Sequence, residues 1–162
     1  MLEKEAMTNI TYERLSAELE YLKTKERNNI AKEIESALEL GDLKENAEYH
    51  SAKDKQGLME ARIVELQDIV SRAQVVDASK LAHKRVSFGS TVLLIDTKTD
   101  EEVTYTIVGG QESNPTKGFI SIKSPLAKVL IGKEEGDSVK IMLPSGQKEF
   151  DIEEVYYKEI EL

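Results

Sequence analysis

The amino-acid sequence predicts two domains: an all-α antiparallel coiled-coil hairpin in residues 1–78, then a small α+β domain with an antiparallel sheet in residues 79–162. Residues 8–76 contain no proline and only two glycines, whereas all three prolines and seven of the nine glycines follow residue 78. Apolar residues recur with a helical period in the first half. In the second half, runs rich in Val, Ile and Thr alternate with Gly, Pro and Asn, as is typical of strands and turns.

The first helix of the hairpin is predicted to begin after Thr8 or Thr11, because either side chain is a good N-cap. Its apolar residues form one stripe, made up of Leu15, Leu19, Leu22, Ile30, Ile34 and Ala37. Between Leu22 and Ile34 the stripe advances in three steps of four residues. This spacing interrupts the heptad pattern and is a stutter in the coiled coil.

A second stripe follows the break at Gly41 and Asp42, and it predicts the returning helix. Its members are spaced alternately by four and three residues, as in a coiled-coil seam: Ala52, Gln56, Met59, Ile63, Leu66, Val70 and Ala73. In an antiparallel hairpin, the sequence numbers of two residues that face each other add up to nearly the same value for every pair along the arms. The pairs Leu19/Leu66 and Leu22/Ile63 meet this condition. Arms of roughly 30 residues would make the hairpin about 45 Å long.

The second half is predicted to contain five strands and one short helix. The short helix or crossover extends from Ser124 to Ile131 and ends at Gly132. A hairpin turn is predicted at Pro144-Ser145-Gly146, between the last two strands. The strands are expected at residues 86–96, 102–109, 118–123, 137–143 and 147–157.

Composition excludes several classes of function. The chain has no cysteine, so it forms neither a disulfide framework nor a thiolate metal site. Its two histidines, His50 and His83, lie far apart in the sequence, and we expect surface or packing roles for them rather than a zinc site. No apolar run approaches the ~20 residues that span a bilayer. We therefore expect a soluble cytoplasmic protein with no membrane partner.

The net charge of −9 bears on nucleic-acid binding. Affinity for DNA or RNA depends largely on Lys and Arg side chains that neutralise phosphates. A chain this acidic should not bind free nucleic acid tightly. Any role on nucleic acid is therefore expected to depend on a protein partner.

Two carboxylates lie at the predicted turn of the hairpin. Gly41 suits the left-handed position that ends the first helix, and Asp42 then precedes Glu45 by three residues. This spacing has a structural interpretation, in which Asp42 and Glu45 form a capping box that starts the second helix. It also has a functional one, because Mg²⁺ is usually held by one or two carboxylates together with waters or phosphate oxygens. The two interpretations are compatible.

Two longer motifs resemble those of a known family. The run GDLKENAEYHSAKDKQ, from Gly41 to Gln56, is similar to the signature of the Gre family of bacterial transcript cleavage factors. A second run, from Ser124-Pro125-Leu126-Ala127 through Gly132 to Asp137, resembles their C-terminal signature. The resemblance extends from Met7 to about Tyr157.

The resemblance implies a C-terminal domain similar to FK506-binding folds, which grips the rim of the secondary channel of RNA polymerase. It further implies that the hairpin enters this channel and stimulates the polymerase's own cleavage of the extruded 3′ end of the RNA, so that the chain is not itself an enzyme. Asp42 and Glu45 would then be the catalytic pair, holding a Mg²⁺ ion shared with the polymerase and not bound stably by this chain alone.

The resemblance also implies contacts for other residues. Lys44 and Lys53 would lie near RNA phosphates, Tyr49 would pack beside the RNA, and Ser124 and Pro125 would contact the polymerase. Some family members carry Arg where this chain has Leu38, so the basic patch here would be thinner.

Alternatives remain for both halves. Ser124 to Ala127 also has the sequence of an ordinary turn into a short helix. A Gre-like regulator could occupy the same channel and inhibit, although the intact pair Asp42 and Glu45 argues against this. A coiled-coil adaptor or isomerase-like chaperone would instead bind client peptides and ignore polymerase.

Overall fold

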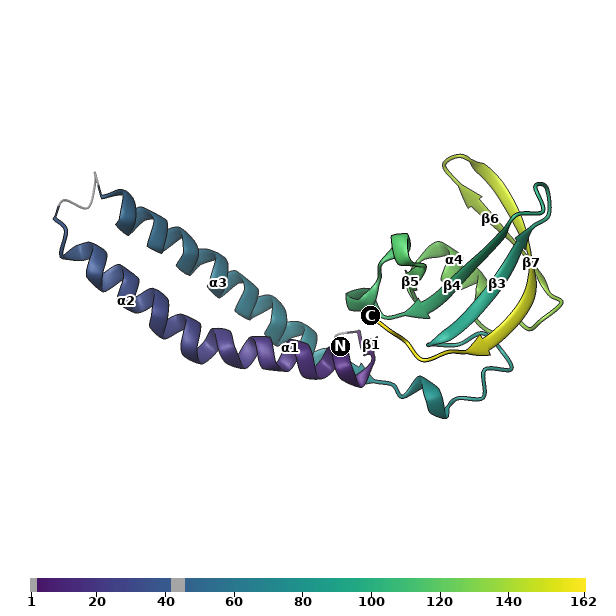
Figure 1. Ribbon diagram of the computed structural model, residues 1–162, viewed down its shortest axis with the longest axis horizontal. Helices are drawn as coiled ribbons and strands as arrows, with labels where there is room; N and C mark the ends of the chain where they lie inside the picture. Colours follow the sequence, from purple (N-terminus) through teal and green to yellow (C-terminus); the bar gives the residue numbers. More distant parts are fainter. Residues whose placement is uncertain (1–2, 42–45) are drawn as a thin grey trace. The chain divides into compact units, whose positions relative to one another are not determined.

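The computed structural model describes residues 3–41 and 46–162. The chain divides into two compact units, one containing Tyr12–Ala73 and the other containing Lys4–Thr11 together with Gln74–Leu162 (Figure 1). The predicted fold class, a helical hairpin followed by a sheet domain, is confirmed. No helix in the described part of the chain is long and apolar enough to cross a membrane.

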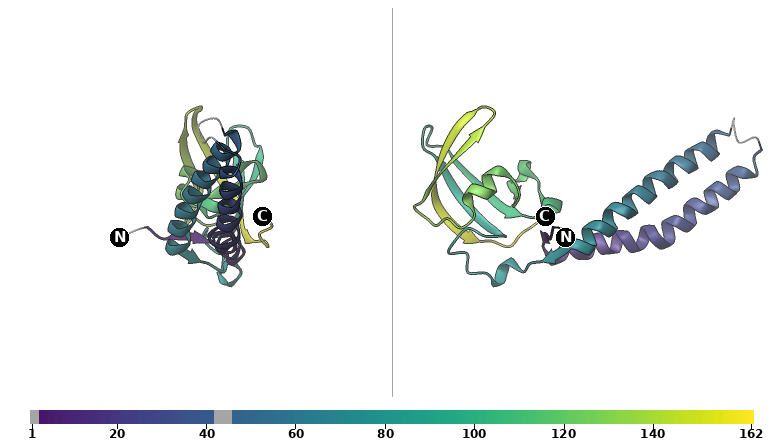
Figure 2. Two further views of the ribbon diagram at one scale, coloured as in Figure 1. Left: turned by 90° about the vertical axis from the view of Figure 1, so that its left-hand side faces the viewer. Right: turned by 180° about the vertical axis from the view of Figure 1, so that it is seen from behind.

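The hairpin has two antiparallel arms (Figures 1 and 2). Helix α1 (Asn9–Tyr21), the π-helical turn η1 (Leu22–Glu26) and helix α2 (Arg27–Leu38) form the first arm. Helix α3 (Ala47–Arg72) forms the second. Of the two predicted starts, the structure selects the earlier one: α1 begins directly after Thr8, whose Oγ1 accepts a hydrogen bond from the N–H of Thr11 at 3.3 Å.

The predicted stripes form the seam between the arms. Ile30, Met59 and Ile63 make a buried cluster. Leu19, Leu22 and Ile34 pack against that cluster and are half-buried. The other members of both stripes are also buried or half-buried: Leu15, Ala37, Ala52, Gln56, Leu66, Val70 and Ala73. The buried seam confirms that the two stripes face each other.

The π-helical turn lies where the sequence predicts a stutter. Steps of four residues exceed the 3.6 residues of an α-helical turn, so successive stripe residues would drift around an ideal helix. A π-helical turn has i→i+5 hydrogen bonds and takes up more residues. The turn at Leu22–Glu26 therefore offsets the drift and keeps Leu22, Ile30 and Ile34 on the face that meets α3.

Ion pairs between described residues connect the arms outside the apolar seam. Arg62 Nε lies 2.8 Å from Glu18 Oε1, Arg27 Nη2 lies 2.9 Å from Glu60 Oε2, and Lys55 Nζ lies 3.2 Å from Glu33 Oε2. Each pair is substantially exposed and contributes little stability by itself. Together they fit the same antiparallel pairing as the seam.

The sheet of the second unit contains all five predicted strands, with ends shifted by up to four residues. The strand order is β5-β4-β3-β7-β6. Helix α4 (Pro125–Leu130) occupies the predicted short-helix segment. The strands are β3 (Ser90–Asp96), β4 (Glu102–Val108), β5 (Phe119–Ser121), β6 (Ser138–Leu143) and β7 (Gly146–Tyr157).

The sheet is mixed, which corrects the expectation of a purely antiparallel one. Strand β5 runs parallel to β4, with Ile120 opposite Ile107. Parallel neighbours cannot be joined by a tight hairpin and need a longer connection. Here the connection contains two 3₁₀ turns, η3 (Gly110–Glu112) and η4 (Pro115–Lys117).

One apolar core lies between the curled sheet and helix α4 (Figure 2). Ala127 and Leu130 of α4 are fully buried in it, together with Val92 and Leu94 of β3. The pairing of β3 with β7 shifts register between Leu93 and Leu94. Such an irregularity bends a strand and increases its twist, which is consistent with the curl of the sheet.

The N-terminal segment belongs to the second unit, a feature that the sequence patterns do not indicate. Strand β1 (Glu5–Met7) pairs with β2 (Ala73–Val75), and Met7 is completely buried. The buried carboxylate of Glu112 accepts hydrogen bonds from Thr8 Oγ1 at 2.6 Å and Thr11 Oγ1 at 2.9 Å. A Cβ atom on Gly109 would collide with the Ala6 carbonyl oxygen, so glycine is needed there.

Candidate functional site

The candidate site is the end of the hairpin, where Asp42, Lys44 and Glu45 were predicted to act. These three residues lie outside the described part of the chain. The residues on either side of them are described. Gly41 has a positive φ of +113°, as predicted, but it does not occupy the predicted position directly after the helix cap, because the C-cap is Glu39 and Leu40 lies between them.

Asn46 caps the second helix. Helix α3 begins at Ala47, and the Asn46 Oδ1 atom accepts a hydrogen bond from the N–H of Tyr49 at 3.0 Å. The backbone of Asn46 is extended, as expected of an N-cap residue. The predicted capping box of Asp42 and Glu45 is therefore wrong, because α3 starts four residues later than Asp42 would require.

The Asn46 side chain makes a second contact, with the first arm. Its Nδ2 atom donates a hydrogen bond to the Ala37 carbonyl oxygen at 2.6 Å. Ala37 lies in the last turn of α2, and its carbonyl oxygen also accepts a hydrogen bond from the N–H of Leu40 at 3.1 Å. One amide therefore serves the start of α3 and the end of α2. Sequence analysis missed this residue, although the order of Asn46 and then a helix-compatible run is a recognisable cap signal.

Tyr49 and Lys53 lie one and two turns into α3. They are four residues apart, so they share a face of the helix. Tyr49 is half-buried and contacts the ring of His50 edge-on, with centroids 5.5 Å apart. Lys53 is exposed, and its Nζ donates to Gln56 Oε1 at 2.8 Å on the same helix. Leu38, at the end of α2, is also exposed.

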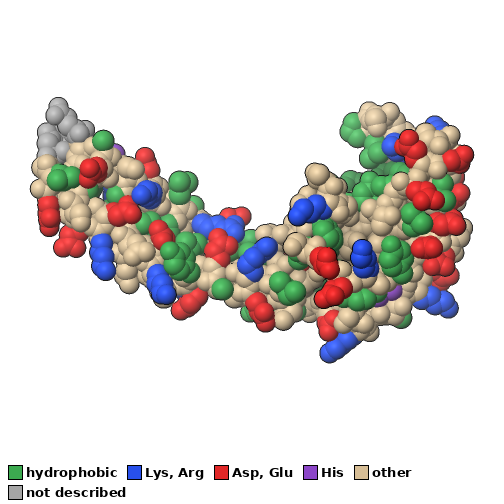
Figure 3. Space-filling model, in the orientation of Figure 1, with side chains coloured by type: hydrophobic (Ala, Val, Ile, Leu, Met, Phe, Trp, Pro, Cys, Tyr) green, Lys and Arg blue, Asp and Glu red, His purple; other side chains and the backbone are tan. Residues whose placement is uncertain are grey.

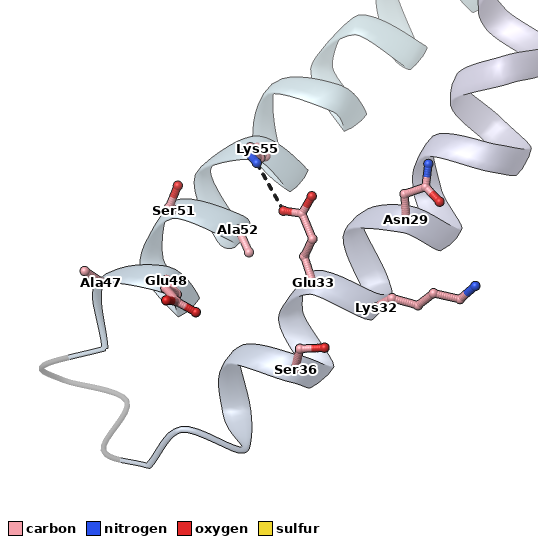
Figure 4. A pocket seen from close by; sticks show the side chains of 9 residues that line it. All are labelled: Asn29, Lys32, Glu33, Ser36, Ala47, Glu48, Ser51, Ala52 and Lys55. Atoms are coloured by element: carbon pink, nitrogen blue, oxygen red, sulfur yellow. Dashed lines mark hydrogen bonds and ion pairs between the residues drawn. The ribbon is translucent and has the colours of Figure 1, made fainter.

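A groove of about 570 Å³ lies between α2 and α3 near this end of the hairpin (Figure 4). Glu33 points across it and pairs with Lys55. Small side chains, among them Ser36, Ala47 and Ala52, also line the groove, together with the polar side chains of Asn29, Lys32 and Glu48. Acidic and basic side chains are interspersed along the hairpin (Figure 3), so this face carries no continuous basic surface.

The described residues do not form a metal site by themselves. Across residues 3–41 and 46–162, no group of three His, Cys, Asp or Glu side chains is placed to hold an ion. Asp42 and Glu45 carry hard oxygen ligands of the kind that Mg²⁺ prefers, but two carboxylates are too few for a complete site. Binding of Mg²⁺ by this pair stays a prediction, and it requires further ligands from elsewhere.

Ser124 and Pro125 lie in the second unit, at the start of α4. Ser124 is the N-cap, and its Oγ accepts a hydrogen bond from the N–H of Ala127 at 3.3 Å. Pro125 occupies the first helical position and is exposed. The turn into a short helix is thus confirmed, while contact of this exposed turn with a polymerase stays a prediction.

His83 has a packing role, as expected. It is buried, its Nδ1 lies 2.7 Å from Ser90 Oγ, and its Nε2 lies 2.6 Å from the Ala78 carbonyl oxygen. Its ring stacks on Tyr157 with centroids 5.2 Å apart. Because Nε2 faces a carbonyl, it must carry the proton of the neutral ring. His83 therefore belongs to the structure of the second unit.

Comparisons with known proteins match both halves of the chain. Residues 5–75 match the family model for "Transcription elongation factor, N-terminal". Residues 81–157 match "Transcription elongation factor, GreA/GreB, C-term".

Curated relatives match nearly the full length. The chain is 69% identical to transcription elongation factor GreA of Sulfurovum sp. over 99% of each chain. It is 62% identical to GreA of Nautilia profundicola over 98% of each chain. It is 56% identical to GreA of Helicobacter pylori, over 98% of this chain and 97% of the relative.

Proposed function

The chain belongs to the GreA/GreB family of transcription elongation factors, and from this premise we propose that it binds RNA polymerase and stimulates cleavage of the transcript in backtracked complexes. The polymerase would perform the hydrolysis, and this chain would be a cofactor rather than an enzyme. It would act in the cytoplasm, where bacterial transcription takes place.

The hairpin suits a role in which functional groups must reach a distant site. Helix α3 has 26 residues and is therefore about 39 Å long. In the proposed complex the hairpin enters the secondary channel, and the turn at Ser124 and Pro125 lies at the channel rim. Pro125 is exposed, and the Ser124 cap fixes the backbone of this turn, so a rigid surface is available for contact.

The observation that carries the proposal is the identity of the α3 cap. Asn46 accepts the hydrogen bond from Tyr49, so neither Asp42 nor Glu45 is needed to start the helix. Two acidic side chains so close to the end of the hairpin are then free for another role. We assign both carboxylates to an ion site that is completed by polymerase and RNA. Mg²⁺ at that site would activate water for attack on the phosphodiester, as in other two-metal hydrolyses.

Lys44, Lys53 and Tyr49 would contact the RNA. The hydrogen bond between Lys53 and Gln56 is exposed, so Lys53 can exchange it for a phosphate at little cost. The half-buried ring of Tyr49 retains an accessible part, which can pack against a base of the extruded 3′ end.

The test uses isosteric changes of the two carboxylates. Asp42→Asn combined with Glu45→Gln removes two anionic ligands while keeping side-chain size. In stalled elongation complexes with 3′-labelled RNA, we expect cleavage to fall by roughly 100-fold or more, a loss typical of removing a catalytic group. Polymerase binding and melting temperature should stay near wild type.

Glu48→Gln is the matched control, because Glu48 is an exposed carboxylate in the first turn of α3. We expect this variant to cleave normally. Near-normal cleavage by the double variant would exclude the ion site. Slower elongation without any cleavage by the wild-type protein would indicate an inhibitor instead.

A further inference from the structure

We propose that Asn46 is a positioning residue: its side-chain amide links the two arms of the hairpin and so fixes the segment that carries Asp42 and Glu45. The inference rests on the proposed function, since it concerns how those carboxylates are held. Its structural basis is independent of that function and lies in three described residues, Ala37, Asn46 and Tyr49.

The chemistry of the two contacts requires an amide. The backbone N–H of Tyr49 binds an acceptor, whereas the carbonyl oxygen of Ala37, which also accepts from the N–H of Leu40 at 3.1 Å, binds a donor. Asp, Ser and Asn are comparable N-caps, but an ionised Asp has no donor. Ser is too short to make both contacts, and Gln adds a methylene group. The two partners also fix the orientation of the amide, with Oδ1 toward Tyr49 and Nδ2 toward Ala37.

The hydrogen bond from Asn46 to Ala37 lies next to the candidate site in the sequence. The bond from Asn46 to Ala37 spans nine residues of sequence, and Asn46 directly follows Glu45. The Ala37 side chain is buried in the seam, and α3 is hydrogen-bonded from its first turn, so both anchors are parts of the hairpin core. The link therefore joins the two arms close to the last described residues before and after Asp42 and Glu45.

Catalytic groups lose much of their effect when they are displaced. A misplacement of about 1 Å can reduce a rate by about 100-fold. A link at the base of a short segment limits such displacement before the ion binds. Asn46 would therefore affect the maximal rate of cleavage rather than the affinity for polymerase, because Tyr49 and Ala37 already occupy both ends of its amide.

The test separates capping from linking by using Asn46→Ser and Asn46→Asp. Both keep a good N-cap, and neither can donate a hydrogen bond to Ala37 while capping α3. In the full-length protein, melting temperature should change by no more than about 4 °C. At saturating factor, the cleavage rate should fall roughly 10- to 100-fold. The factor concentration that gives half-maximal cleavage should stay within about twofold of wild type.

Two further measurements make the result specific. Raising Mg²⁺ should partly restore the rate of Asn46→Ser, because loosened ligands bind the ion more weakly, but should not rescue the variant without the carboxylates. Asn28→Ser is the matched control, since Asn28 is exposed on α2 and the same substitution there should leave cleavage unchanged.

Asn46→Ser that cleaves within about twofold of the wild-type maximal rate would overturn the positioning role. A shift confined to the half-maximal concentration would also overturn it, because Asn46 would then act in polymerase binding. The proposed function has a separate criterion: it fails if the variant without the two carboxylates still cleaves. Loss of activity in that variant with normal activity in Asn46→Ser would refute the positioning role alone.

Discussion

The ion pair of Glu18 and Arg62 shows how single residues join the two arms. Arg62 donates to both carboxylate oxygens of Glu18, at 2.8 and 3.0 Å. This hydrogen bonding holds the pKa of Glu18 below its ordinary value. Both side chains remain more than one-third exposed, so solvent screens much of the interaction.

A pH dependence follows from the direction of that shift. A carboxylate with a lowered pKa in the folded state stabilises the fold above its unfolded pKa, about 4.3 for Glu, and loses this contribution as pH falls through the folded pKa. Glu18→Gln should therefore lower the free energy of unfolding by about 0.5 kcal/mol at pH 7 and by almost nothing at pH 3. Urea unfolding followed by the helical circular dichroism signal measures both values.

Glu20→Gln is the control, because the side chain of Glu20 makes no ion pair with any described residue. An equal loss of stability at pH 7 and pH 3 in Glu18→Gln would show that packing, and not charge, supplies the contribution.

The Asn46 cap shows why a site residue can be missed in a single sequence. Asp42 and Asn46 are both good caps, and spacing alone favoured the pair Asp42 and Glu45. The contact that distinguishes Asn46 from Asp42 as the cap is its hydrogen bond to the Ala37 carbonyl oxygen in the other arm. No local sequence pattern reveals this contact. The identity of the candidate catalytic pair came from the resemblance, and the structure removed the competing explanation of the pair as a helix cap.

At the scale of elements, the hairpin was the most predictable part. Its stripes are long, and burial of Ile30, Met59 and Ile63 is a direct consequence of their spacing. The stutter was visible in the sequence, but its form as a π-helical turn was not, because several local distortions can absorb extra residues. The strands were also located by pattern, whereas their order depends on contacts distant in sequence.

The register of the hairpin can be tested by crosslinking. The chain has no cysteine, so pairs of introduced cysteines give a clean background. Cysteines at positions 19 and 66 should react efficiently with a short bis-thiol reagent, because Leu19 packs on the seam cluster and Leu66 is fully buried. Positions 19 and 70 should react less. The reverse order would mean that the arms are paired one helical turn away from the predicted register.

At the scale of the whole molecule, the least predictable features are those made by distant segments. Strand β1 has only three residues, and its partner β2 lies far away in the sequence. The buried Glu112 is more than 100 residues from Thr8 and Thr11, which it binds. The parallel pairing of β4 and β5 likewise depends on the path of a connection rather than on strand pattern. Such contacts have no periodic signal.

The acidic character of the chain supports a last prediction, that the purified protein neither cleaves nor tightly binds free RNA. The net charge is −9, and charges of both signs are interspersed on the hairpin face that Figure 3 shows, which disfavours the phosphate binding that Lys and Arg drive. Two carboxylates also leave most of the coordination of Mg²⁺ unfilled. Incubation with labelled RNA and Mg²⁺ should therefore give no product until polymerase is added.

The control for this experiment is the variant with Asp42→Asn and Glu45→Gln, which reveals any contaminating nuclease. Cleavage of free RNA by the wild-type protein but not by this variant would contradict the cofactor role, because it would mean that the chain completes an ion site without polymerase. Cleavage by both proteins would point to contamination. In the proposed mechanism, dependence on polymerase and dependence on Asp42 and Glu45 have the same cause: the chain would bring part of an ion site, and its partner would supply the remaining ligands.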